Sequence, residues 1–317
     1  MYIPYLRGRQ FELLALQELL EGERLGANVI PLIEPVKFST TLANTLDEYK
    51  TKSRYISIIR NPEVGSFRNA LFAARDSEDM KIKSKYDSFM EKIEGENVLS
   101  AYILEETARD KLTQIITEQG SLENTVIIVN KRDAADAFRA MLTKYPGKFN
   151  LMPDEREYKR CIPQHKVLLN DWFNKRERNA DYKDHDELVS EDYLYYEDEG
   201  YIGFSDFSIV GDEFKESGFA PNAIALHITY FEGEKLKMRH FTSNSNDDPR
   251  DPAKKYSEAL EKLIVWKVDR GNMDTLAMDT FSEHYKSGSY PGLGSIKKLC
   301  IMQHLELISR YLDGDIK

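Results

Sequence analysis

Residues 29–62, VIPLIEPVKFSTTLANTLDEYKTKSRYISIIRNP, contain the pattern that decides the fold of this chain. The apolar run 29–33 ends at Glu34, a helical pattern follows over roughly 40–51, and a second apolar run, 55–59, ends at Arg60. Continuous runs of Val, Ile and Leu are typical of strands that are covered on both faces. Strand, helix and strand in this order form a βαβ unit, which predicts parallel pairing.

The same alternation extends over the first 210 residues. Helical patterns at about 10–20, 66–93, 108–119 and 133–144 separate apolar runs at 2–5, 98–104, 125–129, 149–152, 166–169 and 201–210. Eight to ten strand candidates are enough to close a (β/α)8 barrel. An open doubly wound sheet is the alternative, but its Gly-rich phosphate loop is absent from the sequence. We therefore predict an α/β fold of the TIM-barrel type.

Two regions depart from this rhythm. Residues 174–199 are dominated by charge and tyrosine, so they form either a lid over the barrel mouth or a solvated insertion. The runs 223–231 and 235–241 are expected to pair as a hairpin. Helical patterns over about 252–268, 274–286 and 293–312 close the chain. We predict a barrel domain over 1–250 with an insertion at 174–199, and C-terminal helices over 251–317 packed on the barrel.

The amino-acid composition limits the cellular compartment and the binding partners that we expect for this protein. The 317 residues hold 44 Lys and Arg against 54 Asp and Glu, a net charge of −10. This balance argues against binding of extended duplex nucleic acid, although it permits a small anion in a local basic cleft. No apolar run reaches the ~20 residues of a membrane span, which predicts no membrane insertion. Two cysteines, Cys161 and Cys300, suit a reducing compartment, so we expect a cytoplasmic protein.

In a parallel barrel, functional residues lie at the carboxyl ends of the strands, where the βα loops converge. Each such polar residue also has an ordinary interpretation as a turn former or helix cap. The residues that the pattern places at strand ends are Arg7, Glu34, Lys37, Arg60, Asn61, Glu105, Glu106, Asn130, Lys131, Arg132, Asp154, Glu155, Asn170 and Asp171.

Asp206 and His227 differ from this group because they lie inside apolar runs, where an unpaired charge is costly. We predict Glu34, Asp171 and Asp206 as a base or as ligands of a divalent metal, and His227 as an acid or base. Carboxylates suit Mg²⁺ or Mn²⁺, whereas two histidines would favour Zn²⁺ or Mn²⁺. No H-E-x-x-H or C-x-x-C element is present to strengthen a metal site.

Basic side chains at the same strand ends form a candidate anion clamp. Arg7, Lys37, Arg60 and Lys131, with Asn61 beside them, are predicted to bind an anionic small molecule. The alternative is that these cations pair with the neighbouring carboxylates.

Nucleophilic chemistry has little support. No G-x-S-x-G elbow is present, Cys161 lies in a predicted loop, and Cys300 lies on the apolar stripe of the last helix. Paired carboxylates leave a weaker alternative, a glycosidase with Glu105 or Glu106 as acid and Asp171 or Asp206 opposite.

The opening residues carry a family resemblance. The stretch from Pro4 to Glu12, then Ala15 and Leu16, and Ile30-Pro31-Leu32-Ile33-Glu34-Pro35-Val36 resemble the "Beta protein" group of bacterial and phage proteins. The runs around Asp206 and His227 are similar to strands of that group. The resemblance implies a barrel-like α/β fold and an accessory or antiviral-defence setting, with no defined activity. It also adds Gln10 and Glu12 to the site residues, which spacing alone does not select.

These observations leave two principal hypotheses. The first is a cytoplasmic barrel hydrolase acting on a phosphorylated or nucleotide-like substrate at the barrel mouth. The second is a non-catalytic binding protein of a defence or mobile-element system. It would recognise a partner protein or a ligand through the same mouth and through 174–199, since tyrosine-rich surfaces favour binding.

Overall fold

The computed structural model describes residues 1–216, 220–268 and 273–316. These residues form two compact units. The barrel unit consists of Met1–Leu13, Val29–Asp171 and Asp192–Asp206, and the second unit consists of Leu14–Asn28, Trp172–Glu191 and Phe207–Lys317. The chain passes between the two units five times, after residues 13, 28, 171, 191 and 206, whereas the sequence indicated one boundary near residue 250.

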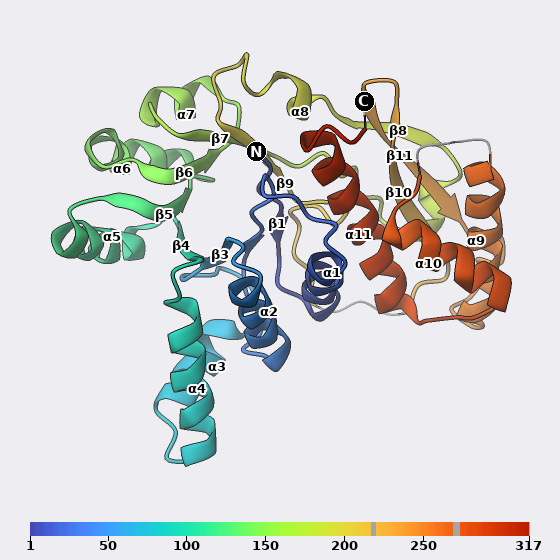
Figure 1. The fold of residues 1–317 in the computed structure, drawn as a ribbon, viewed down its shortest axis with the longest axis horizontal. Helices are drawn as coiled ribbons and strands as arrows, with labels where there is room; N and C mark the ends of the chain where they lie inside the picture. Colours follow the sequence, from blue (N-terminus) through green and yellow to red (C-terminus); the bar gives the residue numbers. More distant parts are fainter. Residues whose placement is uncertain (217–219, 269–272, 317) are drawn as a thin grey trace. The chain divides into compact units, whose positions relative to one another are not determined.

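An eight-stranded parallel sheet forms the barrel unit, which confirms the predicted (β/α)8 architecture (Figure 1). Its strands pair in the order in which they are numbered, and β8 is not among them. The strands are β1 (Tyr5–Leu6), β2 (Leu32–Ile33), β3 (Ile56–Ile59), β4 (Val98–Ile103), β5 (Leu122–Ile128), β6 (Gly147–Met152), β7 (Lys166–Asn170) and β9 (Gly203–Asp206).

The first and last strands of the sheet meet through the segment that precedes β1. Tyr2 bridges Phe204 of β9 in parallel register. The amide of Ile3 donates to the carbonyl of Phe204 at 2.9 Å, and the amide of Phe204 donates to the carbonyl of Met1 at 3.0 Å. These bonds satisfy the edge groups that an open sheet would leave exposed.

Helices alternate with the strands and cover the sheet, as Figure 1 shows for α5, α6 and α7. The elements that follow successive strands are α1 (Gln10–Glu21), which continues into the second unit, α2 (Thr40–Thr51), α3 (Phe67–Arg75), α4 (Met80–Ile93), α5 (Glu106–Gln119), α6 (Arg132–Lys144), α7 (Arg156–Cys161) and α8 (Asp192–Tyr195). All four residues of β3 are buried, as expected for a strand covered on both faces.

One predicted helix proved to be two. The pattern at 66–93 indicated a single helix, but α3 ends at Arg75 and α4 starts at Met80. Asp79 caps α4, because its carboxylate accepts the amide of Lys81 at 2.8 Å and satisfies a donor that has no helical partner. Cys161 was placed in a loop, and it is instead the buried last residue of α7.

The second unit contains a three-stranded antiparallel sheet in the order β10-β11-β8. The predicted hairpin at 223–241 is confirmed, but it belongs to this sheet. The sequence indicated that segment 174–199 is a lid or a solvated insertion. In the structure its strand β8 pairs with β11, and its helix α8 lies in the barrel unit. The elements are η1 (Asn179–Tyr182), β8 (Asp186–Ser190), β10 (Ala225–Glu232), β11 (Lys235–Thr242), α9 (Pro252–Val268), α10 (Leu276–Ser287) and α11 (Leu293–Leu312).

The three C-terminal helices have nearly the predicted bounds. They pack within the second unit, where α11 contacts β10 and α10, and α9 contacts β11 and α10 (Figure 1). No helix in the described ranges combines the length and the apolar character needed to cross a bilayer.

Candidate functional site

The strand ends of the barrel unit carry the polar residues that the sequence placed there. Arg7, Glu34, Arg60 and Glu105 lie one or two residues beyond β1, β2, β3 and β4. Asp206 is the last residue of β9, and Asp171 follows β7 directly and is exposed. The periodicity therefore located these strand ends correctly, although position alone assigns no chemical role.

Glu34 is the most constrained of these side chains. It is fully buried, and its Oε2 accepts the hydroxyl of Tyr5 at 2.8 Å and the guanidinium of Arg7. Its Oε1 accepts the amide of Glu63 at 2.8 Å. Burial, followed by the Glu34 carboxylate, raises the pKa of Tyr5 well above its ordinary value, so the phenol stays a donor. Both oxygens are thus occupied, which suits an anchoring role better than proton transfer or metal binding.

Lys131 also has an ionic partner. It pairs with the carboxylate of Glu63, whose amide binds Glu34. The predicted anion clamp is therefore partly an internal ion-pair network, the alternative that the sequence left open. Lys37 and Gln10 are exposed at the surface. Glu12 is instead buried and accepts the amide of Arg9 at 3.1 Å, as expected of an acidic residue in the first turn of a helix.

Asp206 lies where the barrel closes. It is 7% exposed, and its Oδ1 accepts the hydroxyl of Tyr2 at 2.7 Å. Tyr2 is the residue whose backbone bridges β9, so this hydrogen bond ties the last strand to the segment before the first. Burial and then the charge of Asp206 raise the pKa of Tyr2 well above its ordinary value. These contacts give Asp206 a structural role in closing the barrel.

His227 was predicted to line the mouth with these carboxylates, but it lies on β10 of the second unit. Its Nδ1 is 2.8 Å from Nδ1 of His240. Burial and then His240 lower the pKa of His227 well below its ordinary value, so it is neutral at pH 7 and no acid there. Its strand belongs to the antiparallel sheet, which is why the barrel rule for strand ends does not apply to it.

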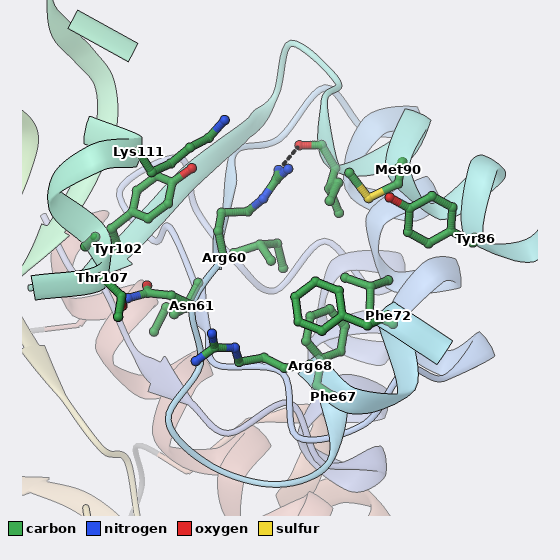
Figure 2. A pocket seen from close by; sticks show the side chains of 15 residues that line it. Arg60, Asn61, Phe67, Arg68, Phe72, Tyr86, Met90, Tyr102, Thr107 and Lys111 are labelled. Carbon is green, nitrogen blue, oxygen red and sulfur yellow. Dashed lines mark hydrogen bonds between the residues drawn. The ribbon is translucent and has the colours of Figure 1, made fainter. Parts of the chain in front are cut away.

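A pocket of about 400 Å³ lies between the βα segments that follow β3 and β4 (Figure 2). It contains Arg60 and Asn61, two of the predicted binding residues. Figure 2 shows Phe67, Phe72, Tyr86 and Met90 on one side of Arg60, and Tyr102, Thr107 and Lys111 on the other. The volume falls within the range of small-molecule sites.

The polar groups of this pocket are mainly cationic. Arg60, Arg68 and Lys111 line it, and none of its 15 lining residues is acidic. The Nη1 of Arg60 donates to the carbonyl of Ile93 at 3.3 Å and to the hydroxyl of Ser100 at 3.4 Å, both neutral acceptors. Lys111 donates to the amide oxygen of Gln114 at 3.1 Å. Cations whose partners are neutral retain their attraction for an anion.

Glu105 contacts two residues of the pocket wall. Its Oε1 accepts the hydroxyl of Thr107 at 2.5 Å and the amide of Asn61 at 3.2 Å. The Thr107 hydrogen bond, with smaller contributions from Asn61 and the charge of Arg68, lowers the pKa of Glu105. A carboxylate held ionised at pH 7 is a poor general acid, which argues against Glu105 as the acid of a glycosidase.

Several lining residues escaped the sequence analysis. Arg68 and Lys111 lie on α3 and α5 among many other charged residues, so nothing local separates them from ordinary solvated charges. Tyr86 and Met90 belong to α4, whose placement beside α3 depends on the break at Asp79. Their juxtaposition is a property of the tertiary structure.

The eight parallel strands and the helices that alternate with them define a (β/α)8 barrel. Its pocket lies beside the carboxyl ends of β3 and β4. No protein-family model matches the chain, and no curated protein matches it in sequence. Among solved structures, the chain is similar to the Bacillus cereus spore cortex-lytic enzyme SleL, with 10% identity and a TM-score of 0.34. The alignment covers 97% of this chain and 73% of that one. A likeness at this level supports no argument about function.

Proposed function

We propose that the barrel unit binds an anionic, phosphorylated small molecule with an aromatic part, of the nucleotide class, in the pocket around Arg60. The observation that carries the proposal is the combination of three cations with four aromatic rings in a pocket without an acidic residue. Guanidinium and ammonium groups bind phosphate oxygens, and the rings supply a stacking or apolar surface for a base.

Binding of adenosine monophosphate, adenosine and inorganic phosphate, measured by isothermal titration calorimetry, tests this proposal. We expect the monophosphate to bind at least tenfold more tightly than adenosine, because each charge-assisted hydrogen bond contributes about 1.5–3 kcal/mol. Arg68→Met and Lys111→Met should each weaken monophosphate binding about tenfold. Arg139→Met, which removes an exposed arginine from α6, is the matched control and should bind normally. Equal affinity for the nucleoside and its monophosphate would refute the proposal.

Glu105 supports hydrolysis of the bound phosphate ester as a second candidate function. Its carboxylate contacts Asn61 and Thr107 of the pocket wall, and its lowered pKa keeps it ionised at pH 7, so it can accept a hydrogen bond from an attacking water and orient it. The setting in phage defence depends on the family resemblance alone and remains a prediction.

Phosphate release from the monophosphate measures this activity. Glu105→Gln should slow turnover about 100-fold, since a positioned base contributes roughly 10²–10⁴ in rate, while monophosphate affinity is retained. Because the pKa of Glu105 is lowered from its ordinary value, the wild-type rate should stay level as the pH falls from 7 through the ordinary glutamate range, and it should fall only in more acidic solution, where the carboxylate takes up a proton. Turnover that is undiminished in Glu105→Gln would exclude Glu105 from the reaction, and a wild type without turnover would leave the protein with binding alone.

A partner protein for 174–199 also remains a prediction.

A further inference from the structure

Three potential metal ligands meet where β8 pairs with β11 in the second unit. Glu187 lies opposite Met238 in register, and the amide of His240 donates to the carbonyl of His185 at 3.2 Å. Side chains alternate along strands, so residues 185 and 187 share one face with residues 238 and 240. Two imidazoles and a carboxylate are thereby brought together from positions about 55 residues apart in the sequence.

The ligand atoms are close to the spacing that a single ion requires. Nε2 of His185 lies 2.9 Å from Oε1 of Glu187, and Nε2 of His240 lies 3.6 Å from Oε2 of the same carboxylate. One ligand atom from each residue lies within 4.8 Å of the others. Ligands at about 2.0–2.1 Å from a tetrahedral Zn²⁺ are roughly 3.4 Å apart, so small side-chain adjustments suffice.

His240 provides an independent indication of a ligand. Its side chain is fully buried, and its Nε2 makes no hydrogen bond of ordinary length, because the Glu187 carboxylate that it faces is 3.6 Å away. A buried ring nitrogen held beyond hydrogen-bond distance from the carboxylate that it faces is poorly satisfied, and an ion between the two groups would satisfy both. His185 is 42% exposed, which leaves a route from solvent to the same point.

The surroundings of His240 match those of a metal-binding histidine. Its other nitrogen, Nδ1, is 2.8 Å from Nδ1 of His227, so an Nδ1–H donated to His227 would leave Nε2 as the lone-pair donor. The ring of Tyr182 packs against both imidazoles, with centroids at 4.5 and 4.7 Å, and fixes their orientation. His227, predicted above as an acid or base, is on this geometry a positioning residue.

One cation competes for the same carboxylate. Arg176 donates from its Nη2 to Oε1 of Glu187 at 2.7 Å. Its guanidinium neutralises Glu187 in the ion-free protein, and it must share or release that oxygen when a metal binds.

We propose that His185, Glu187 and His240 bind one divalent ion of the Zn²⁺ type, with the fourth position left to water. Borderline-soft ions with mixed nitrogen and oxygen ligands fit this set, whereas Mg²⁺ and Ca²⁺ require oxygen ligands. The ion would clamp β8, which belongs to the 174–199 segment, onto the β10–β11 hairpin.

Titration of chelator-treated protein with ZnCl₂ in a calorimeter, and with CoCl₂ followed by its visible absorption, tests this site. We expect one ion per chain, a raised melting temperature and no binding of Mg²⁺. His185→Gln, on the half-exposed ligand, and His240→Phe, which keeps an aromatic ring beside Tyr182, should each weaken Zn²⁺ binding at least tenfold. His284→Gln removes a histidine that contacts Tyr256 and should bind like the wild type.

A third variant, Arg176→Gln, should strengthen Zn²⁺ binding rather than weaken it. Loss of the competing guanidinium should tighten Zn²⁺ binding severalfold if Glu187 is a ligand. The proposal is overturned if the wild type takes up no Zn²⁺ at micromolar concentrations, or if His185→Gln and His240→Phe bind it normally. Unchanged or weaker binding by Arg176→Gln would remove Glu187 from the site.

Discussion

Arg7→Met is expected to lower the free energy of unfolding by about 3–5 kcal/mol, the cost of leaving a buried ionic group without its counter-charge. Glu34 is fully buried, the Arg7 side chain is only 12% exposed, and the carboxylate cannot recover its lost partner from solvent. The hydroxyl of Tyr5 and the amide of Glu63 would remain as its donors. Urea unfolding followed by circular dichroism measures the loss.

Two comparisons make this result specific. Lys131→Met breaks the Lys131–Glu63 pair, whose side chains are 53% and 31% exposed, and should cost at most about 1 kcal/mol. Arg7→Met combined with Glu34→Gln removes both charges but keeps an acceptor for Tyr5, so it should recover most of the stability. An Arg7→Met variant no less stable than Lys131→Met would show that the pair contributes little to the fold.

Gly65→Ala should destabilise the barrel unit by roughly 2–4 kcal/mol, because the strain of an L-residue in a left-handed backbone conformation adds to a steric overlap with Val36. Gly65 has a φ of +75°, a region that L-residues avoid, and a Cβ there would lie 2.7 Å from Cα of Val36 and even closer to its carbonyl oxygen. That carbonyl accepts the amide of Ser66 at 2.9 Å. The substitution would therefore displace the loop whose residue 63 binds Glu34.

Gly120→Ala measures the backbone strain without the steric overlap. Gly120 has a similar φ of +77°, but its Cβ would meet nothing within 4 Å, so only the backbone cost of about 1–2 kcal/mol applies. The difference between the two variants in urea unfolding measures the steric contribution. Equal destabilisation would mean that the loop at Gly65 adapts to the added methyl group.

The candidate site was predictable only in part. Sequence periodicity placed Arg60 and Asn61 at a strand end, and both line the pocket. It also selected Glu34 and Lys131, but their ion pairs with Arg7 and Glu63 were visible only in three dimensions. Whether two charged side chains form an ion pair depends on the distance between segments that are far apart in the sequence. The spacing of residues along one segment carries no information about that distance.

The histidine cluster is a sharper example of the same limit. His227 and His240 attracted attention because they interrupt apolar runs, whereas His185 lies in a charged segment and attracted none. All three meet because β8 adds to the β10–β11 hairpin, an edge pairing across more than 45 residues. No local pattern specifies which edge a short, charged strand will join.

The sequence by itself determined the barrel, because buried parallel strands and the helices that cover them leave a periodic apolar pattern along the chain. Only the tertiary structure decided where the chain divides, which charges at the strand ends are already paired, and which cations face the pocket. It also decided that 174–199 supplies a strand to a second sheet. These features depend on non-local contacts, and the free energy of a non-local contact is set by residues distant in the sequence.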